Sequence, residues 1–143
     1  MPSYMPQAIT DQWATPQYLF DEWDAKYHFD LDPAASASNH KCQEWYGLDH
    51  EDETKRDGLA IDWKGESVWL NPPYGRVLNY WVKKAYDSNL HVTMLLPVRT
   101  DTRWFHSYCV NQNITFIKGR VKFGDSKAAA PFPSMIVVMR PHA

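Results

Sequence analysis

The sequence lacks the features that mark membrane, secreted, disulfide-rich or metal-binding proteins. No apolar run reaches the roughly 18 residues that a membrane span needs, and the N-terminus lacks the basic start and apolar core of a secretory signal. The only two cysteines, Cys42 and Cys109, are far apart and have no partner motif, which favours free thiols over a disulfide. The six histidines show no metal-ligand spacing. These absences predict a cytoplasmic protein with no membrane association and no metal site.

Charge is divided unevenly along the chain, although the net charge is only −2. Residues 1–63 carry 4 Lys or Arg and 13 Asp or Glu, whereas residues 64–143 carry 11 Lys or Arg and 4 Asp or Glu. This asymmetry favours one acidic and one basic face, and the basic face is a candidate surface for a polyanion. The alternative is that the two halves interleave in space and neutralise one another.

The length of 143 residues predicts a single domain. We expect residues 1–14 to be a loosely ordered lead-in and residues 15–143 to form one compact domain, without a separate recognition domain. Apolar residues at helical spacing predict helices over residues 16–26, 77–88 and 102–110. Thr15 is the expected N-cap of the first helix, and Pro16 its first helical residue.

Strands are predicted where short apolar or alternating runs end at a proline or a turn. These runs cover residues 29–32, 68–70, 92–96, 114–118 and 135–139, and weaker extended segments are expected at 44–46 and 61–63. Strands that alternate with helices predict an α/β fold, with a mostly parallel central sheet and helices on both faces.

The most informative motif is Asn71-Pro72-Pro73-Tyr74, directly after the apolar run 68–70. Two consecutive prolines cannot continue a strand or a helix interior, because neither has an N–H to donate. The loop therefore offers an Asn amide, proline carbonyls and an aromatic ring at the carboxyl end of a strand, where α/β sheets bind ligands. Such a group suits an amine on a flat ring, since two acceptors can make its nitrogen more nucleophilic while the ring stacks. A purely structural turn is the alternative interpretation.

A second candidate site begins at Asp32, the acid that ends the first predicted core strand. The small residues Pro33, Ala34 and Ser36 follow it, in a loop that lets another molecule approach the backbone. This position is typical of nucleotide-like cofactor sites, although the glycine-rich fingerprint is absent. Asp32 as a helix cap is the alternative.

Both motifs resemble those of S-adenosylmethionine-dependent amino-methyltransferases, and nearly the whole chain resembles the compact phage and prophage DNA N-6-adenine methyltransferases. The similarity is carried by the blocks FDLDPAAS (29–36), VWLNPPYG (68–75), LLPVRTDTRWFH (95–106), IKGRVKF (117–123) and APFPS (130–134). The resemblance implies a Rossmann-like class I methyltransferase domain, with S-adenosylmethionine as cofactor and DNA as partner. It also implies a phage- or prophage-encoded enzyme that works in a bacterial host cell.

Site roles follow from this resemblance residue by residue. Asn71, Pro72 and Tyr74, with Pro73 in the same loop, would hold and activate an adenine that has left its stack. The cofactor would lie against Asp32, with Thr15, Pro16 and the backbone of 33–36 beside it. Asp57 and Asp62 are both candidates for the cofactor's adenine. Ala35 and Ala37 stand where the broader family has Cys and Gly, which leaves the path of this loop open.

The basic second half supplies candidate DNA contacts. Alternation within 118–122 would place three cations on one side of an extended segment. The candidates for phosphate contact are Arg99, Arg103, Lys118, Arg120, Lys122 and Lys127. The alternative is a solvated edge strand whose charges prevent aggregation. Residues 128–134 could form a flap over the base pocket.

Rival functions share part of this pattern. Methyltransferases of protein glutamine also use Asn-Pro-Pro-Tyr, and RNA is another substrate for the same chemistry. A DNA-binding or cofactor-binding relative that has lost catalysis is the rival from a different class. The basic second half and the close block match favour DNA, and the intact Asn71 and Tyr74 favour an enzyme. The sequence leaves a homodimer and the recognised DNA site open.

Overall fold

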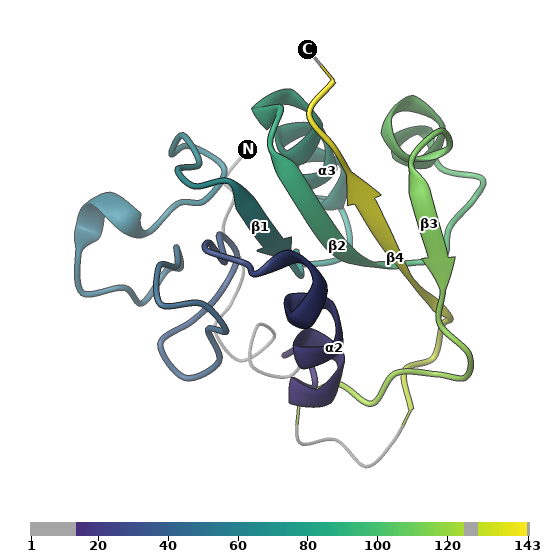
Figure 1. Ribbon diagram of the computed structural model, residues 1–143, viewed down its shortest axis with the longest axis horizontal. Coiled ribbons are helices and arrows are strands. Elements are labelled where there is room, and N and C mark those ends of the chain that lie inside the picture. The colour runs from purple at the N-terminus through teal and green to yellow at the C-terminus, as the bar shows by residue number, and fades with distance from the viewer. Residues whose placement is uncertain (1–13, 125–128, 143) are drawn as a thin grey trace.

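The computed structural model of the protein describes residues 14–124 and 129–142 (Figure 1). Within them the elements, in chain order, are α2 (Gln17–Tyr27), η1 (Glu53–Lys55), β1 (Ser67–Leu70), α3 (Leu78–Ser88), β2 (His91–Pro97), η2 (Phe105–Cys109), β3 (Asn113–Phe116) and β4 (Ser134–Met139). The expected lead-in 1–14 therefore lies outside the described residues, apart from Ala14. None of the helices in the described ranges is long and apolar enough to cross a membrane.

The four strands of the described sheet lie in the order β1-β2-β4-β3. β1 pairs with β2 in parallel, whereas β4 pairs antiparallel with both β2 and β3. β1, β2 and β3 therefore run in one direction, and β4 runs against them. The α/β class is confirmed, but the sheet is mixed and the expected mostly parallel sheet is only partly right. A continuously apolar strand such as β4 is buried on both faces in either orientation, so its composition does not encode its direction.

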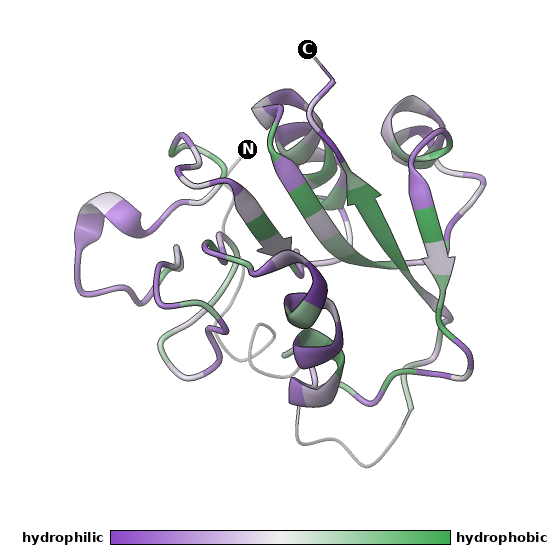
Figure 2. Cartoon of the chain, in the orientation of Figure 1, coloured by the Kyte–Doolittle hydropathy of each residue, from purple (hydrophilic) through white to green (hydrophobic). Residues whose placement is uncertain are grey.

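Helices cover both faces of the sheet, as predicted. On one face α3 buries Leu78, Trp81, Val82 and Ala85, the same four residues that its periodicity predicts. On the other face α2 packs Leu19, Phe20 and Trp23 against strand residues that alternate with those of the first face. Figure 2 shows hydrophobic residues concentrated along β4 and much of β2, between these helices. The two layers fix the strand ends where the site lies.

The segment predicted as a strand at 29–32 forms only isolated bridges. Leu31 pairs in parallel with Val68, and Asp32 pairs in parallel with Trp45. The Trp69 amide donates to the Leu31 carbonyl at 2.9 Å, which aligns this segment beside β1. Its carboxyl end therefore lies next to that of β1, although the run is too short for a strand. Residues 44–46 contribute only the Trp45 bridge, and residues 61–63 form no strand.

Two further elements differ from their predicted type or bounds. The helix predicted over 102–110 is a π-helix at 105–109, η2, preceded by Thr102, whose hydroxyl accepts from the Phe105 amide at 3.4 Å. The strand predicted over 114–118 ends at Phe116, because the chain bends at 118–119, where Gly119 has a φ of 77°. Both cysteines are buried free thiols, as expected.

Candidate active site

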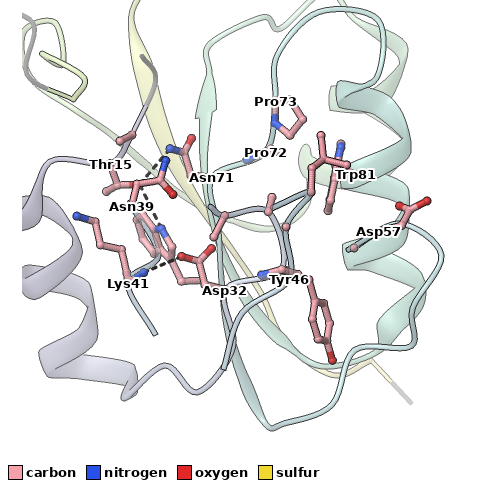
Figure 3. Close-up of a pocket in the computed structure, with 18 of the residues that line it drawn as sticks. Thr15, Asp32, Asn39, Lys41, Tyr46, Asp57, Asn71, Pro72, Pro73 and Trp81 are labelled. Carbon is pink, nitrogen blue, oxygen red and sulfur yellow. Dashed lines mark hydrogen bonds between the residues drawn. The ribbon is translucent and has the colours of Figure 1, made fainter. Parts of the chain in front are cut away.

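A cavity of about 780 Å³, including its open mouth, lies where the Leu31 segment and β1 end (Figure 3). Its size suits a small organic ligand. Its walls come from the segment just before α2, the loops after Asp32 and β1, and α3. The lining residues are Ala14, Thr15, Asp32, Pro33, Ala34, Ala35, Asn39, Lys41, Tyr46, Gly47, Leu48, Arg56, Asp57, Gly58, Trp69, Asn71, Pro72, Pro73 and Trp81.

The two ends of this cavity differ in chemistry. One end gathers the polar side chains of Thr15, Asp32, Asn39 and Lys41, whereas Pro73, Trp81 and Asp57 lie at the other (Figure 3). The first end offers opposite charges and hydrogen-bonding groups. The second combines flat apolar surface with a single carboxylate. A ligand that is zwitterionic at one end and flat at the other matches this division.

Asp32 is the buried acid of the polar end, with only 4% of its surface exposed. Its Oδ2 accepts from the Lys41 amide at 2.9 Å, and its backbone pairs with Glu44 and Tyr46. Burial raises the pKa of the Asp32 carboxyl to about 6, against lowering effects from the Lys41 hydrogen bond and the nearby charges of His40 and Lys41. A cation placed in the cavity would favour the ionised carboxyl.

Two glycines allow the loop after Asp32 to pack closely. A Cβ at Gly47 would lie 2.0 Å from the Ala35 carbonyl oxygen, and one at Gly58 would lie 2.1 Å from that of Pro33. The backbone at 33 and 35 therefore lies close against residues 58 and 47, and neither glycine position has room for a side chain. Neither glycine belongs to the motifs identified from the sequence.

Asn71 is held by Thr15, a residue 56 positions earlier in the chain. The Asn71 Nδ2 donates to the Thr15 Oγ1 at 3.0 Å, and the Trp69 Nε1 donates to the same oxygen at 3.3 Å. The predicted N-cap role of Thr15 is wrong: α2 begins at Gln17, Pro16 occupies the N-cap position, and no side chain caps the helix. The Pro16 carbonyl accepts the first helical bonds instead, so the Thr15 hydroxyl serves the site.

Tyr74 lies on the far side of the loop and does not line the cavity. Its hydroxyl donates to the Leu95 carbonyl at 3.2 Å, and burial raises the pKa of the phenol above its ordinary value. Its ring meets Phe132 edge-on at 5.5 Å and Phe123 edge-on at 6.2 Å, and among the described residues these three rings form an aromatic cluster. The Arg99 guanidinium lies 5.8 Å from the Phe132 ring. The Asn-Pro-Pro-Tyr loop therefore separates the cavity from the aromatic cluster.

The sequence identified part of the cavity wall. Asp57 lines the cavity, whereas the rival acid Asp62 is exposed and does not. Pro16 and Ser36 are also outside the lining, although the Ser36 amide is bonded to Asn39 Oδ1 at 2.8 Å. Lining residues that the sequence missed include Asn39, Lys41, Tyr46 and Trp81. They lie on loops or on a helix face whose periodicity indicates only packing, so no local pattern distinguishes them.

The candidate DNA contacts lie beyond the carboxyl ends of β2 and β3. Arg99 and Arg103 follow β2, and the other cations follow β3, which runs in the same direction as β2. Val121 and Phe123 point inward, and Lys122 between them is exposed, as are Arg99, Arg103, Lys118 and Arg120. Lys127 lies outside the described residues, as does the first residue of the expected flap, Ala128. Phe132 of that flap packs on Tyr74.

Comparisons with known proteins identify the family of this chain. A family model described as DNA N-6-adenine-methyltransferase (Dam) matches residues 2–143. The DNA N-6-adenine-methyltransferase of Haemophilus phage HP1 (strain HP1c1) is 32% identical over 147 residues, covering 93% of this chain and 80% of that protein. The protein of the same name from Escherichia phage T1 is 37% identical over 105 residues, covering 70% of this chain but only 41% of its own length. The predicted family is confirmed, and the chain belongs to the DNA N-6-adenine-methyltransferase family.

Proposed function

We propose that this chain methylates the N-6 amine of adenine in DNA, with S-adenosylmethionine as methyl donor and the target base turned out of the duplex. The observation that carries the proposal is the position of the Asn-Pro-Pro-Tyr loop. Asn71, Pro72 and Pro73 line a ligand-sized cavity, while Tyr74 joins the aromatic cluster behind them. A methyl donor and a base bound on the two sides of this loop would meet at Asn71.

We propose further that residues 15–143 form one Rossmann-like class I methyltransferase domain, with residues 1–14 as its lead-in. Three features support this assignment: β1, β2 and β3 share one direction, β4 is inserted against them, and helices cover both faces. The cavity lies at the carboxyl ends of strands, as ligand sites do in doubly wound sheets.

The cavity fits S-adenosylmethionine, which is an α-amino acid at one end and a nucleoside at the other. Asp32 would receive the ammonium group, and Thr15, Asn39 and Lys41 surround the space beside it. The flat end near Trp81 and Pro73 would receive the adenosine, with Asp57 as its polar partner. When bound, this cofactor supplies an electrophilic methyl group on a sulfonium centre. Asp57 is the better of the two candidate acids, because Asp62 is exposed and outside the cavity.

Asn71 and Pro72 would activate the adenine amine. The amine lone pair is delocalised into the purine ring, which makes the nitrogen a poor nucleophile. If the Asn71 amide oxygen and the Pro72 carbonyl each accept a hydrogen bond from one N–H of the amine, they would favour a tetrahedral nitrogen and stabilise the charge that develops on it. The loop would also hold the amine at a fixed distance from the methyl group, which lowers the entropic part of the barrier. Tyr74 and Phe132 would pack against the base.

Exposed cations would hold the DNA beside this loop. Arg99, Arg103, Lys118, Arg120 and Lys122 lie at the sheet edge that carries the site, where phosphate contacts would fix the duplex in register. Such contacts carry little sequence information. The recognised site would then depend on groups close to the flipped base.

The proposal is tested by offering tritiated S-adenosylmethionine with unmethylated DNA, RNA or a protein mixture. We expect label in DNA, released as N-6-methyladenine, and we expect Asn71→Ala to abolish it while the variant still binds S-adenosylhomocysteine. Asn113→Ala is the matched control, because Asn113 is exposed at the amino end of β3, away from the site. Label confined to RNA or protein, or full activity of Asn71→Ala, would refute the proposed function.

A further inference from the structure

Thr15 makes a contact that neither cofactor binding nor helix capping explains. Its side-chain oxygen accepts from the Asn71 Nδ2 at 3.0 Å and from the Trp69 Nε1 at 3.3 Å, and only 5% of the residue is exposed. Figure 3 shows Thr15 beside Asn71 at the polar end of the cavity, with the bond between them dashed. The segment just before α2 therefore reaches the loop after β1 through one buried hydroxyl.

The direction of this hydrogen bond matters for catalysis. An Asn side chain can present either its oxygen or its nitrogen to a partner, and the two arrangements have nearly the same shape. With the nitrogen turned toward Thr15, the amide oxygen is directed away from Thr15, where an incoming amine can use it. In the reversed arrangement the NH₂ group would face the substrate amine, donor against donor. The acceptor needed for the developing positive charge would then be missing.

Trp69 strengthens the preference for the productive arrangement. An indole N–H can only donate, so it occupies one of the two lone pairs of the Thr15 oxygen. The hydroxyl retains one lone pair for the Asn71 nitrogen and one proton for another acceptor. If a ligand in the cavity accepts a hydrogen bond from this hydroxyl, the Thr15 oxygen can act toward Asn71 only as an acceptor. Thr15 lines the cavity and is placed to meet such a partner.

We propose that Thr15 is a positioning residue for methyl transfer, which holds the Asn71 amide with its oxygen available to the adenine amine. The inference rests on the proposed function, because it assigns Asn71 the role of amine acceptor. It changes the expected role of Thr15 from a cofactor contact alone to a link between the cavity and the catalytic loop. Asn71 would be fully oriented only when the cavity is filled.

The test separates orientation from cofactor affinity. Thr15→Val keeps the shape of the side chain but removes the oxygen, Thr15→Ser keeps the hydroxyl, and Thr115→Val on the exposed side of β3 is the matched control. We would measure S-adenosylhomocysteine affinity by calorimetry, the unfolding midpoint, and the single-turnover rate of DNA adenine methylation at saturating cofactor. For Thr15→Val we expect the rate to fall roughly 100-fold, the effect of a misplaced catalytic group. Cofactor affinity should change much less, and Thr15→Ser should recover most of the rate.

Three results would overturn the inference. Thr15→Val could bind S-adenosylhomocysteine much more weakly while its rate at saturating cofactor is unchanged, which would make Thr15 a cofactor ligand only. Thr15→Ser could be as impaired as Thr15→Val, which would make the methyl group the important part. The wild-type protein, bound to S-adenosylhomocysteine, could show no nuclear Overhauser contact between the Asn71 side-chain amide protons and Thr15, a measurement that needs no variant to fold. Failure of the wild-type protein to methylate DNA would instead refute the proposed function.

Discussion

Replacement of Asp32 by Asn should stabilise the ligand-free protein at neutral pH while it weakens cofactor binding. Asp32 is buried, and its pKa is raised from the ordinary value of 3.8 to about 6, chiefly because burial disfavours the charged carboxylate. Between these two pH values the folded protein holds the proton more tightly than the unfolded chain. The free energy of unfolding therefore falls as the pH rises through this window. Each unit of pKa difference corresponds to about 1.4 kcal/mol, so ionised Asp32 lowers the free energy of unfolding by roughly 3 kcal/mol above pH 6.

Asn at position 32 keeps the acceptor for the Lys41 amide but never ionises. Urea unfolding at pH 8, without ligand, should show Asp32→Asn more stable than wild type by up to about 3 kcal/mol, and the difference should shrink to about half at pH 5. Asp62→Asn, at an exposed carboxyl outside the cavity, is the control and should leave stability unchanged. A variant that is less stable than wild type at pH 8 would mean that its hydrogen bonds outweigh desolvation.

Cofactor binding should respond in the opposite direction. A ligand ammonium group stabilises the Asp32 carboxylate, so wild-type affinity for S-adenosylhomocysteine should rise with pH through about 6 and then level off. Loss of a hydrogen-bonded charge pair costs about 1.5–3 kcal/mol, so Asp32→Asn should bind roughly 10- to 100-fold more weakly at pH 8. Calorimetry across this pH range measures both effects. Equal affinities of the two proteins at pH 8 would remove Asp32 from the cofactor site.

Three further variants test other parts of the site. Gly47→Ala should lower the free energy of unfolding by about 1–3 kcal/mol, because its Cβ would lie 2.0 Å from the Ala35 carbonyl oxygen, and a wild-type urea midpoint would contradict this. Lys41→Gln should weaken the binding of S-adenosylhomocysteine about tenfold, by about 1.4 kcal/mol, if the Lys41 ammonium group pairs with the carboxylate of the ligand. The affinity of this variant for decarboxylated S-adenosylhomocysteine, measured by calorimetry, should then change little. An equal loss of affinity for both ligands would argue that Lys41 does not contact the carboxylate. Lys118→Gln combined with Arg120→Gln should reduce the slope of DNA affinity against salt by about 2, measured by fluorescence anisotropy, and an unchanged slope would exclude phosphate contact.

Sequence patterns predicted the parts of the fold that depend on residues close together in the chain. The helical spacing of Leu78, Trp81, Val82 and Ala85 identified α3 and its buried face, because two turns of helix place these residues on one side without help from the rest of the chain. The direction of β4 depends instead on how residues 117–133 return to the sheet. That return is a property of the whole fold, and no residue within β4 records it.

The site divides in the same way. Asp32 and Asn71 could be identified because each directly follows a predicted strand, and the carboxyl ends of such strands meet at one sheet edge. Lys41 and Gly47 reach the cavity only because the chain after Asp32 folds back, with the Tyr46 amide donating to the Asp32 carbonyl at 3.0 Å. That return depends on contacts between residues 14 positions apart, which have no periodic signature. Only the helix-capping role predicted for Thr15 is wrong, since a Thr before a Pro resembles a helix cap in any sequence.

The two prolines of the Asn-Pro-Pro-Tyr loop matter because neither has a backbone N–H. Pro72 is buried and Pro73 is half-buried, and both line the cavity, so a backbone N–H at either position would be a donor that needed a partner. Two prolines leave only carbonyl acceptors there. Such a lining favours an exocyclic amine over a keto oxygen, because the oxygen would meet acceptors without a donor between them. Gly75, with a φ of 98°, then turns the chain so that α3 begins at Leu78 and brings Trp81 back to the cavity. Under the proposed function, the loop itself would favour an amino base, before any contact with DNA.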